Sequence, residues 1–219
     1  MRYQNSIPRT QTSELATNKV LRNTYMLLAM TLIAASLGAG VSAMMGLPRP
    51  GLIITLVGFY GLMFLTEKNR DSGLGLVFIF AFTAFTGYTI GPIINHYLSS
   101  ASGTETVMLA LGGTALTFLS LSAYVLTTKK DMSFLGGMMM AGFVILLVGV
   151  VANLFFHIPA LSQALSALFI LFSSGAILMQ TSAIIHGGER NYISATITLY
   201  VSIFNIFLSL LSLLGLSRD

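Results

Sequence analysis

Apolar residues in this chain form seven long runs that are separated by short polar connections. The runs cover residues 24–45, 51–66, 73–94, 106–128, 132–155, 161–185 and 192–216. Most of them reach the roughly 20 residues that an α-helix needs to cross a hydrocarbon core about 30 Å thick. The pattern therefore predicts an all-α membrane protein with seven transmembrane helices, of which the second, 51–66, is the shortest.

Charged side chains are confined to the segments between the runs. The 11 basic and 7 acidic residues all lie outside the apolar stretches. An ionisable group at bilayer depth is costly, and it usually marks an ion path, a proton relay or a cofactor counter-ion. The absence of such groups favours binding, packing or regulation over these chemistries.

Composition narrows the function classes further. Hydrophobic residues make up 55% of the chain and charged residues 8%, which is typical of a protein whose main partner is the lipid bilayer. The net charge of +4 comes from basic residues scattered singly between runs, so no nucleic-acid partner is expected. The chain has no cysteine, and its three histidines lie at run ends without the spacing of metal ligands, so neither a metal nor a cofactor is expected.

The distribution of lysine and arginine predicts the orientation. Nine of them fall before the first run or in the second, fourth and sixth connections, whereas the alternate side has only Arg49 and Arg218. Cytoplasmic loops carry the excess of basic residues in membrane proteins. The N-terminus is therefore expected in the cytoplasm and, with an odd number of spans, the C-terminus in the periplasm.

Short connections indicate one compact transmembrane domain, residues 23–219, preceded by a polar segment, residues 1–22. That segment is rich in Ser, Thr, Asn and Gln, so it is expected to be a flexible cytoplasmic tail with helix only near Lys19. Four of its charged residues are candidate contacts for a cytoplasmic partner: Arg2, Arg9, Glu14 and Lys19.

Polar residues inside the last two runs recur at helical spacing. In the seventh run they lie three or four residues apart, on one helix face: Ser194, Thr198, Ser202, Asn205, Ser209 and Ser212. The sixth run carries a second stripe: Ser162, Ser166, Ser173 and Gln180, with Thr181 beside it. We call Ser173, Thr181, Thr198, Asn205 and Ser209 the polar seam.

The polar seam has two interpretations. It could line a hydrated path for a small solute, or it could join helices through small residues and weak hydrogen bonds. Packing is favoured, because the stripes carry no charge and each such bond contributes only about 0.6 kcal/mol on average. The pair Gly87-x-x-x-Gly91 in the third run likewise indicates close helix packing.

Several motifs resemble the Bax inhibitor-1 family. They are Arg22-Asn23-Thr24-Tyr25, Phe82-Thr83 with Gly87 and Pro92, the stretch from Thr128 to Gly136, and Ile184-Ile185-His186-Gly187 followed by Asn191-Tyr192-Ile193 and Ile203-Phe204-Asn205. The resemblance covers the whole chain. It implies six helices packed around a central C-terminal seventh, which agrees with an inward polar stripe on that run.

The resemblance also bears on chemistry. Calcium-leak members of the family use a pair of intramembrane aspartates on the sixth and seventh helices, and here those positions hold Gln180 and Ser202. An amide and a hydroxyl cannot share protons as paired carboxylates do. A calcium leak gated by pH is therefore not expected in this chain.

For a bacterial inner-membrane protein, the resemblance implies a non-enzymatic regulator that binds and restrains the ATP-dependent membrane protease FtsH. The tail would engage the protease while the bundle resists extraction, so that the chain acts as a slowly degraded substrate. The alternative is a channel or transporter for a small solute or ion through the uncharged polar seam. Enzyme activity is not expected, because an intramembrane serine protease needs a His beside its Ser within the bilayer, and all three His lie at run edges.

Overall fold

The computed structural model describes the backbone of residues 9–216 and the side chains of residues 15–215. The described chain is helical and contains α1 (Arg9–Met44), α2 (Leu52–Lys68), α3 (Gly73–Leu98), α4 (Gly103–Thr128), the short 3-10 helix η1 (Ser133–Leu135), α5 (Gly136–Phe156), α6 (Pro159–Ile185) and α7 (Tyr192–Leu216). These helices match the seven predicted runs, which confirms the all-α membrane fold. Six of them are long and apolar enough to cross a membrane. The exception is α2, whose 17 residues span about 26 Å at 1.5 Å per residue, as its short run predicted.

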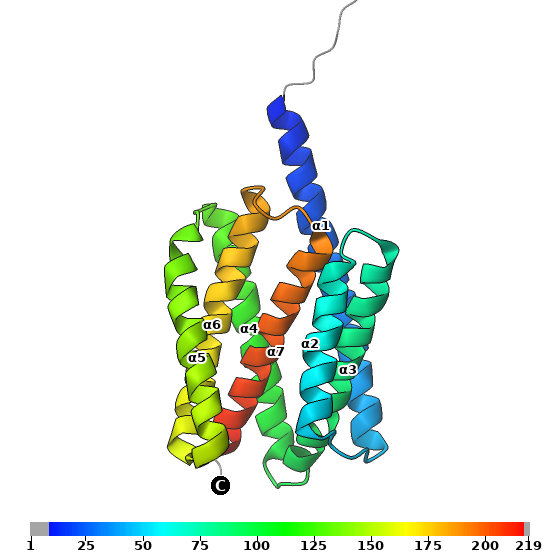
Figure 1. Ribbon diagram of the computed structural model, residues 1–219, viewed down its shortest axis with the longest axis vertical. Helices are drawn as coiled ribbons and strands as arrows, with labels where there is room; N and C mark the ends of the chain where they lie inside the picture. Colours follow the sequence, from blue (N-terminus) through cyan, green and yellow to red (C-terminus); the bar gives the residue numbers. More distant parts are fainter. Residues whose placement is uncertain (1–8, 217–219) are drawn as a thin grey trace, which may run out of the picture.

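Successive helices run antiparallel, so every second connection lies at the same end of the bundle (Figure 1). The α2–α3, α4–α5 and α6–α7 connections share the end from which α1 projects, and they carry the basic residues from Lys68 to Arg190. We call this the basic end. It corresponds to the side that the charge pattern assigns to the cytoplasm.

The first helix begins before the bundle does. It starts at Arg9, so the expectation of helix only near Lys19 is corrected. Once the apolar part of α1 has formed a helix, each further residue extends it without a new nucleation cost. Residues 15–23 include no buried side chain, and burial begins at Thr24. The first part of α1 therefore projects from the basic end as a single helix (Figure 1).

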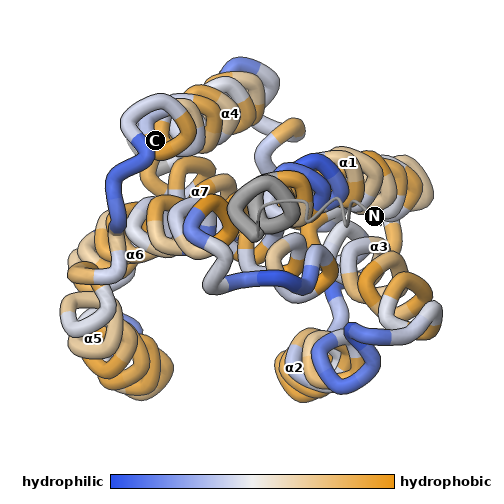
Figure 2. The backbone as a smooth tube through the Cα atoms, turned by 90° about the horizontal axis from the view of Figure 1, so that it is seen from above, coloured by the Kyte–Doolittle hydropathy of each residue, from blue (hydrophilic) through white to orange (hydrophobic). Residues whose placement is uncertain are grey.

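The C-terminal helix α7 lies at the centre, as the family resemblance implied. It packs directly against α1, α2, α3, α4 and α6, while α5 packs against α6 and η1 at the edge of the bundle (Figure 2). Tyr200 in the middle of α7 is 2% exposed, and its hydroxyl lies 2.6 Å from Thr86 Oγ1 of α3. Its ring also meets Phe82 edge-on, with 5.7 Å between the ring centroids.

Small residues bring α1 and α3 together. A Cβ added to Gly87 would lie 2.1 Å from the backbone oxygen of Ala35, and one added to Gly38 would lie 2.7 Å from the backbone oxygen of Ala84. Only the absence of a side chain allows this backbone approach, so Gly87 acts in close packing as its motif predicted.

A hydrogen bond from α1 replaces the backbone hydrogen bond that a proline in α3 removes. Pro92 has no N–H, so the carbonyl of Tyr88 one turn earlier loses its helical partner. The hydroxyl of Ser42 in α1 donates to that carbonyl at 3.0 Å. The family motif around Pro92 thus becomes part of the contact between α1 and α3.

Candidate functional site

The polar face of α7 is turned into the bundle. Ser202 and Ser209 are buried, and Thr198 and Asn205 are half-buried. The hydroxyl of Thr198 donates to the carbonyl of Ser194 at 3.1 Å, and that of Ser202 donates to the carbonyl of Thr198 at 2.8 Å. These protons are used within the helix, so they are not available to a solute.

The polar side chains on the part of α6 that faces α7 differ from those of α7 in their hydrogen bonding. Ser173 and Thr181 are no more than 1% exposed, and α6 packs against α7. Among the described residues, the hydroxyls of Ser173 and Thr181 and the amide nitrogen of Gln180 are buried and have no hydrogen-bond partner. A buried polar group without a partner costs about 1–3 kcal/mol. The α6 half of the polar seam therefore has unused hydrogen-bonding capacity inside the protein.

Gln180 and Ser202, which the sequence resemblance matched to the family's paired aspartates, carry no titrating group. Gln180 is half-buried and Ser202 is buried, and Ser202 donates within α7 instead of to Gln180. The acidic residues Glu67 and Asp71 lie at the basic end, where their partners are Ser194 and Asn191. Neither the amide nor the hydroxyl changes charge near neutral pH, so this pair cannot act as a proton-controlled gate.

The described structure contains an apolar crevice of about 770 Å³. Its walls come from α1, α3 and α4, with α7 behind them, and its lining includes Ala39, Gly87, Phe118 and Phe207. Because the lining is almost entirely hydrocarbon, the crevice offers no path to a polar solute.

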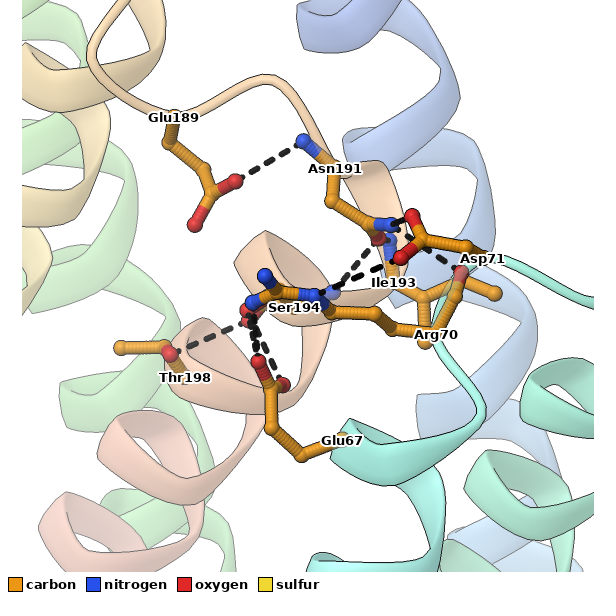
Figure 3. Close-up of polar contacts among 8 residues, drawn as sticks. All are labelled: Glu67, Arg70, Asp71, Glu189, Asn191, Ile193, Ser194 and Thr198. Carbon is orange, nitrogen blue, oxygen red and sulfur yellow. Dashed lines mark hydrogen bonds and ion pairs between the residues drawn. The ribbon is translucent and has the colours of Figure 1, made fainter.

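Polar contacts at the basic end tie α7 to the corner between α2 and α3 (Figure 3). We call the residues that make them, Glu67, Arg70, Asp71, Asn191 and Ser194, the α7 clamp. Asn191 caps α7: its side-chain oxygen accepts hydrogen bonds from the backbone N–H groups of Ile193 at 2.9 Å and of Ser194 at 3.1 Å. Its amide nitrogen donates to the backbone oxygen of Arg70 at 3.0 Å and to Asp71 Oδ1 at 2.7 Å.

Glu67 completes the α7 clamp from the end of α2. Both of its carboxylate oxygens lie 3.0 Å from the Ser194 hydroxyl, which is the donor. The same carboxylate accepts a hydrogen bond from Arg70, and this contact, together with the charge of Glu67, raises the pKa of the Arg70 guanidinium above its ordinary value. The α7 clamp thus joins α7 to the α2–α3 corner through the carboxylates of Glu67 and Asp71 and the cap residue Asn191.

The α7 clamp was not among the sites expected from sequence, although one of its residues could have been identified from a local motif. An Asn directly before an apolar run is a helix N-cap signal, so Asn191 could have been identified in that role. Glu67 could not, because Ser194 is 127 positions away along the chain and nothing local indicates the pairing.

The predicted tail residues are placed only in part. Arg2 lies outside the described residues, and Arg9 and Glu14 lie in the projecting part of α1. Lys19 is exposed on the same helix. Within residues 15–215, whose side chains are described, Lys19 has no hydrogen bond or ion pair to the polar seam.

Comparison with known proteins agrees with the fold. Residues 17–219 match the family described as inhibitor of apoptosis-promoting Bax1. The chain is 61% identical over 210 residues, 95% of both chains, to the modulator of FtsH protease YccA of Escherichia coli K12, and equally to the inner membrane protein YccA of E. coli O6:H1. An uncharacterized protein of Pseudomonas aeruginosa is 59% identical over 198 residues, which are 90% of this chain and 89% of that one. The seven-helix fold, the motifs and these matches together show that this multi-pass inner-membrane protein belongs to the Bax inhibitor-1 family.

Proposed function

We propose that this protein is a non-enzymatic regulator that binds an FtsH-type membrane protease and restrains its action on other membrane proteins. The observation that carries the proposal is the 61% identity, over 95% of both chains, with a relative named modulator of FtsH protease. Among the described residues no Asp, Glu, Lys or Arg is buried, which suits a regulator better than a carrier of protons or cations.

The projecting part of α1 is the segment that the protease would engage. None of its residues 15–23 is buried. Helices shorter than about 12–15 residues are only marginally stable in water without packing. A pulling machine could therefore unwind this segment and grip it while the bundle remained folded.

The packing of the bundle supports the proposal that this protein resists extraction from the membrane. A pull on α1 first meets Thr24, where burial begins and where Thr196 of α7 donates to the carbonyl of Thr24 at 3.2 Å. It then meets the close packing with α3 at Gly38 and Gly87. Because α7 is held by five other helices and by the α7 clamp, removing α1 would disturb most of the fold. The protease would stay occupied during this slow step.

Deletion of residues 2–17 is expected to relieve inhibition without unfolding the bundle, because the segment contributes no described buried contact. The measurement is the degradation rate of a second membrane substrate by purified protease in the same bilayer, with and without this protein. Thermal unfolding of the truncated protein checks that the bundle is intact.

A matched control replaces residues 2–17 by a Gly/Ser-rich segment of equal length, which keeps the length of the N-terminal extension but removes the charges of Arg2, Arg9 and Glu14. Inhibition retained by this variant would assign the effect to the presence of an N-terminal extension, and inhibition lost would assign it to the native sequence of the segment. Equal inhibition by the deleted and the full-length proteins would refute a role for the segment.

The proposal requires the basic end to face the cytoplasm, where the catalytic machine works, and the C-terminus to face the periplasm. The excess of basic residues at that end supports this orientation. A reporter fused after Asp219 should be active only as a periplasmic reporter. Activity of a cytoplasmic reporter at the same position would reverse the orientation.

A second candidate, passage of a small uncharged solute, is favoured by one observation: the buried unpartnered polar atoms of Ser173, Gln180 and Thr181. If a path exists there, liposomes containing the protein should take up urea or glycerol faster than empty liposomes. Gln180→Leu should remove the excess rate, whereas Ser36→Ala, on the exposed face of α1, should leave it unchanged. Equal rates with and without protein would exclude this candidate and leave the regulatory proposal standing.

A further inference from the structure

The apolar crevice lies between α1 and α4 and opens on the side of the bundle. Within the described part of the chain, α1 and α4 do not pack against each other, although each of them packs against α7 (Figure 2). Gly40 on the α1 wall and Ala115 on the α4 wall are exposed, so the crevice is open between these helices. Because both helices are long and apolar enough to cross a membrane, this opening faces the lipid. The floor includes Phe204 and Phe207, so the central helix α7 can be reached from the bilayer.

Small side chains on α1 create the space. The α1 wall consists largely of Ala, Gly and Ser residues: Ala35, Ser36, Ala39, Gly40 and Ala43. On the side toward α3, a Cβ added to Gly91 would lie 2.8 Å from the backbone oxygen of Ala39, so the two helices are already in close contact. On the side toward α4, a Cβ added to Gly40 meets nothing within 4 Å. Close packing with α3 therefore holds α1 in place and leaves the gap toward α4.

The lining favours hydrocarbon over water. Its hydroxyl groups are already used: Ser36 and Thr114 donate to backbone oxygens of their own helices at 2.8 and 2.7 Å, and the hydroxyl of Tyr200 pairs with that of Thr86 at 2.6 Å. A buried water needs about two to four polar partners, and apolar cavities without them stay dry. An empty space of this size forfeits packing contacts of the side chains around it. An apolar occupant is therefore expected, and at this depth the surrounding solvent is itself hydrocarbon.

The dimensions of the crevice suit an acyl chain better than a helix. Its lining extends along α1 from Leu32 to Met44, which is about 18 Å at 1.5 Å per residue. One leaflet contributes about half of a hydrocarbon core that is about 30 Å thick, so the crevice is about as long as one leaflet is deep. The volume spread over this length corresponds to a channel about 7 Å across, whereas an α-helix with its side chains is about 10–12 Å across.

The position of the crevice indicates the leaflet. One end of its lining is formed by Met44 and Leu98, the last residues of α1 and α3, at the end of the bundle opposite the basic end (Figure 1). The other end reaches Phe118 of α4 and Tyr200 in the middle of α7. A chain that fills the crevice therefore enters from the side opposite the basic end and stops near the middle of the bundle.

We propose that the crevice is a binding site for one acyl chain of a membrane phospholipid from the leaflet opposite the basic end. The methyl end of the chain lies against Phe118 and Tyr200, and the headgroup lies beyond Met44 and Leu98. Binding of this lipid is a property of the bundle itself and does not depend on the proposed binding of a protease.

Photocrosslinking of the full-length protein in lipid nanodiscs tests the proposal. The nanodiscs contain phosphatidylglycerol in which one acyl chain carries a diazirine, either near its methyl end or near its carboxyl end. The methyl-end probe should label Tyr200 and Ile203, which are 2% and 8% exposed and line the crevice. The carboxyl-end probe should label Met44 and Leu98 instead. Equal labelling of α7 by the two probes, or no labelling of α7 by either, would overturn the proposal.

Variants that fill the crevice provide the matched comparison. Gly40→Phe places a ring in the crevice, whereas Gly112→Phe places one on α4 outside the lining, and a Cβ added to either glycine meets nothing within 4 Å. Gly40→Phe should abolish the labelling of Tyr200 and Ile203, and Gly112→Phe should leave it unchanged. Ala115→Phe fills the crevice from the opposite wall and should give the same loss. Thermal unfolding checks that each variant is folded. Labelling that persists in both crevice variants, or that disappears in Gly112→Phe, would contradict the proposed site.

Native mass spectrometry of the protein released from the nanodiscs distinguishes the possible occupants. The expected species is a monomer that retains one phospholipid. A lipid-free dimer would assign the crevice to a second copy of the chain, and an adduct with the mass of a free fatty acid would assign it to that molecule. Either of these two results would overturn the proposal.

Discussion

Gly87→Ala is expected to destabilise the bundle by about 3 kcal/mol, the upper end of the usual range for overpacking a tight core. A Cβ at this position would lie 2.1 Å from the backbone oxygen of Ala35 and 2.9 Å from its Cα. The obstacle is backbone, which cannot rotate away as a flexible side chain can. α1 and α3 would have to separate. This would also break the hydrogen bond from Ser42 to the carbonyl of Tyr88, which Pro92 leaves without a helical partner. The free energy of unfolding in mild detergent is the measurement.

Gly40→Ala provides the matched control for this prediction. Gly40 lies in α1, and a Cβ added there meets nothing within 4 Å. Alanine is favoured over glycine in a helix by about 1 kcal/mol, so this variant should be neutral or slightly more stable. Similar stabilities for the two variants would mean that close backbone approach between α1 and α3 does not contribute to stability.

Asn191→Ala is expected to cost about 2 kcal/mol, of which about 1 comes from the lost N-cap and the rest from the two bonds to the α2–α3 corner. The substitution leaves the N–H groups of Ile193 and Ser194 without their acceptor. It also removes the donor to Asp71 and to the backbone of Arg70, so the start of α7 loses its direct link through Asn191 (Figure 3). The same unfolding measurement applies.

Asn191→Ser separates the two contributions. Serine is about as good an N-cap as asparagine, but it cannot reach Asp71 and Arg70 in the same way. About half of the loss should be recovered. Full recovery would show that the link to the α2–α3 corner adds nothing to the free energy of unfolding. An Asn191→Ala variant as stable as the unmodified protein would show that the hydrogen bonds of Asn191 in the α7 clamp do not contribute to stability.

The variants Gly87→Ala and Asn191→Ala also test the proposed restraint of the protease. If slow extraction depends on a firmly packed bundle, Gly87→Ala and Asn191→Ala should be degraded faster and should inhibit less than the unmodified protein. Gly40→Ala should resemble the unmodified protein in both respects. Weakened inhibition without faster degradation would point to a lost contact surface instead of a loosened bundle.

Sequence reasoning located the helices well and the contacts between them poorly. Six of the seven helices begin and end within four residues of the predicted runs, because burial in lipid imposes a length and a composition on each span. The first helix is the clearest miss: composition indicated a flexible segment before Lys19, whereas helix extends from the apolar part of α1 back to Arg9. Periodicity in α6 and α7 could not show that Thr198 and Ser202 donate within their own helix while Gln180 has an unpartnered nitrogen.

By itself, the sequence determined the helical class, the spans, the segregation of basic residues to one end and the absence of ionisable groups from the apolar runs. These features depend on hydrophobicity and charge, which are properties of single residues and short segments. The tertiary structure alone decided that Glu67 meets Ser194 and that Ser42 serves the carbonyl freed by Pro92. Such contacts depend on the register and rotation of helices that are distant in the chain, and local pattern carries no information about either.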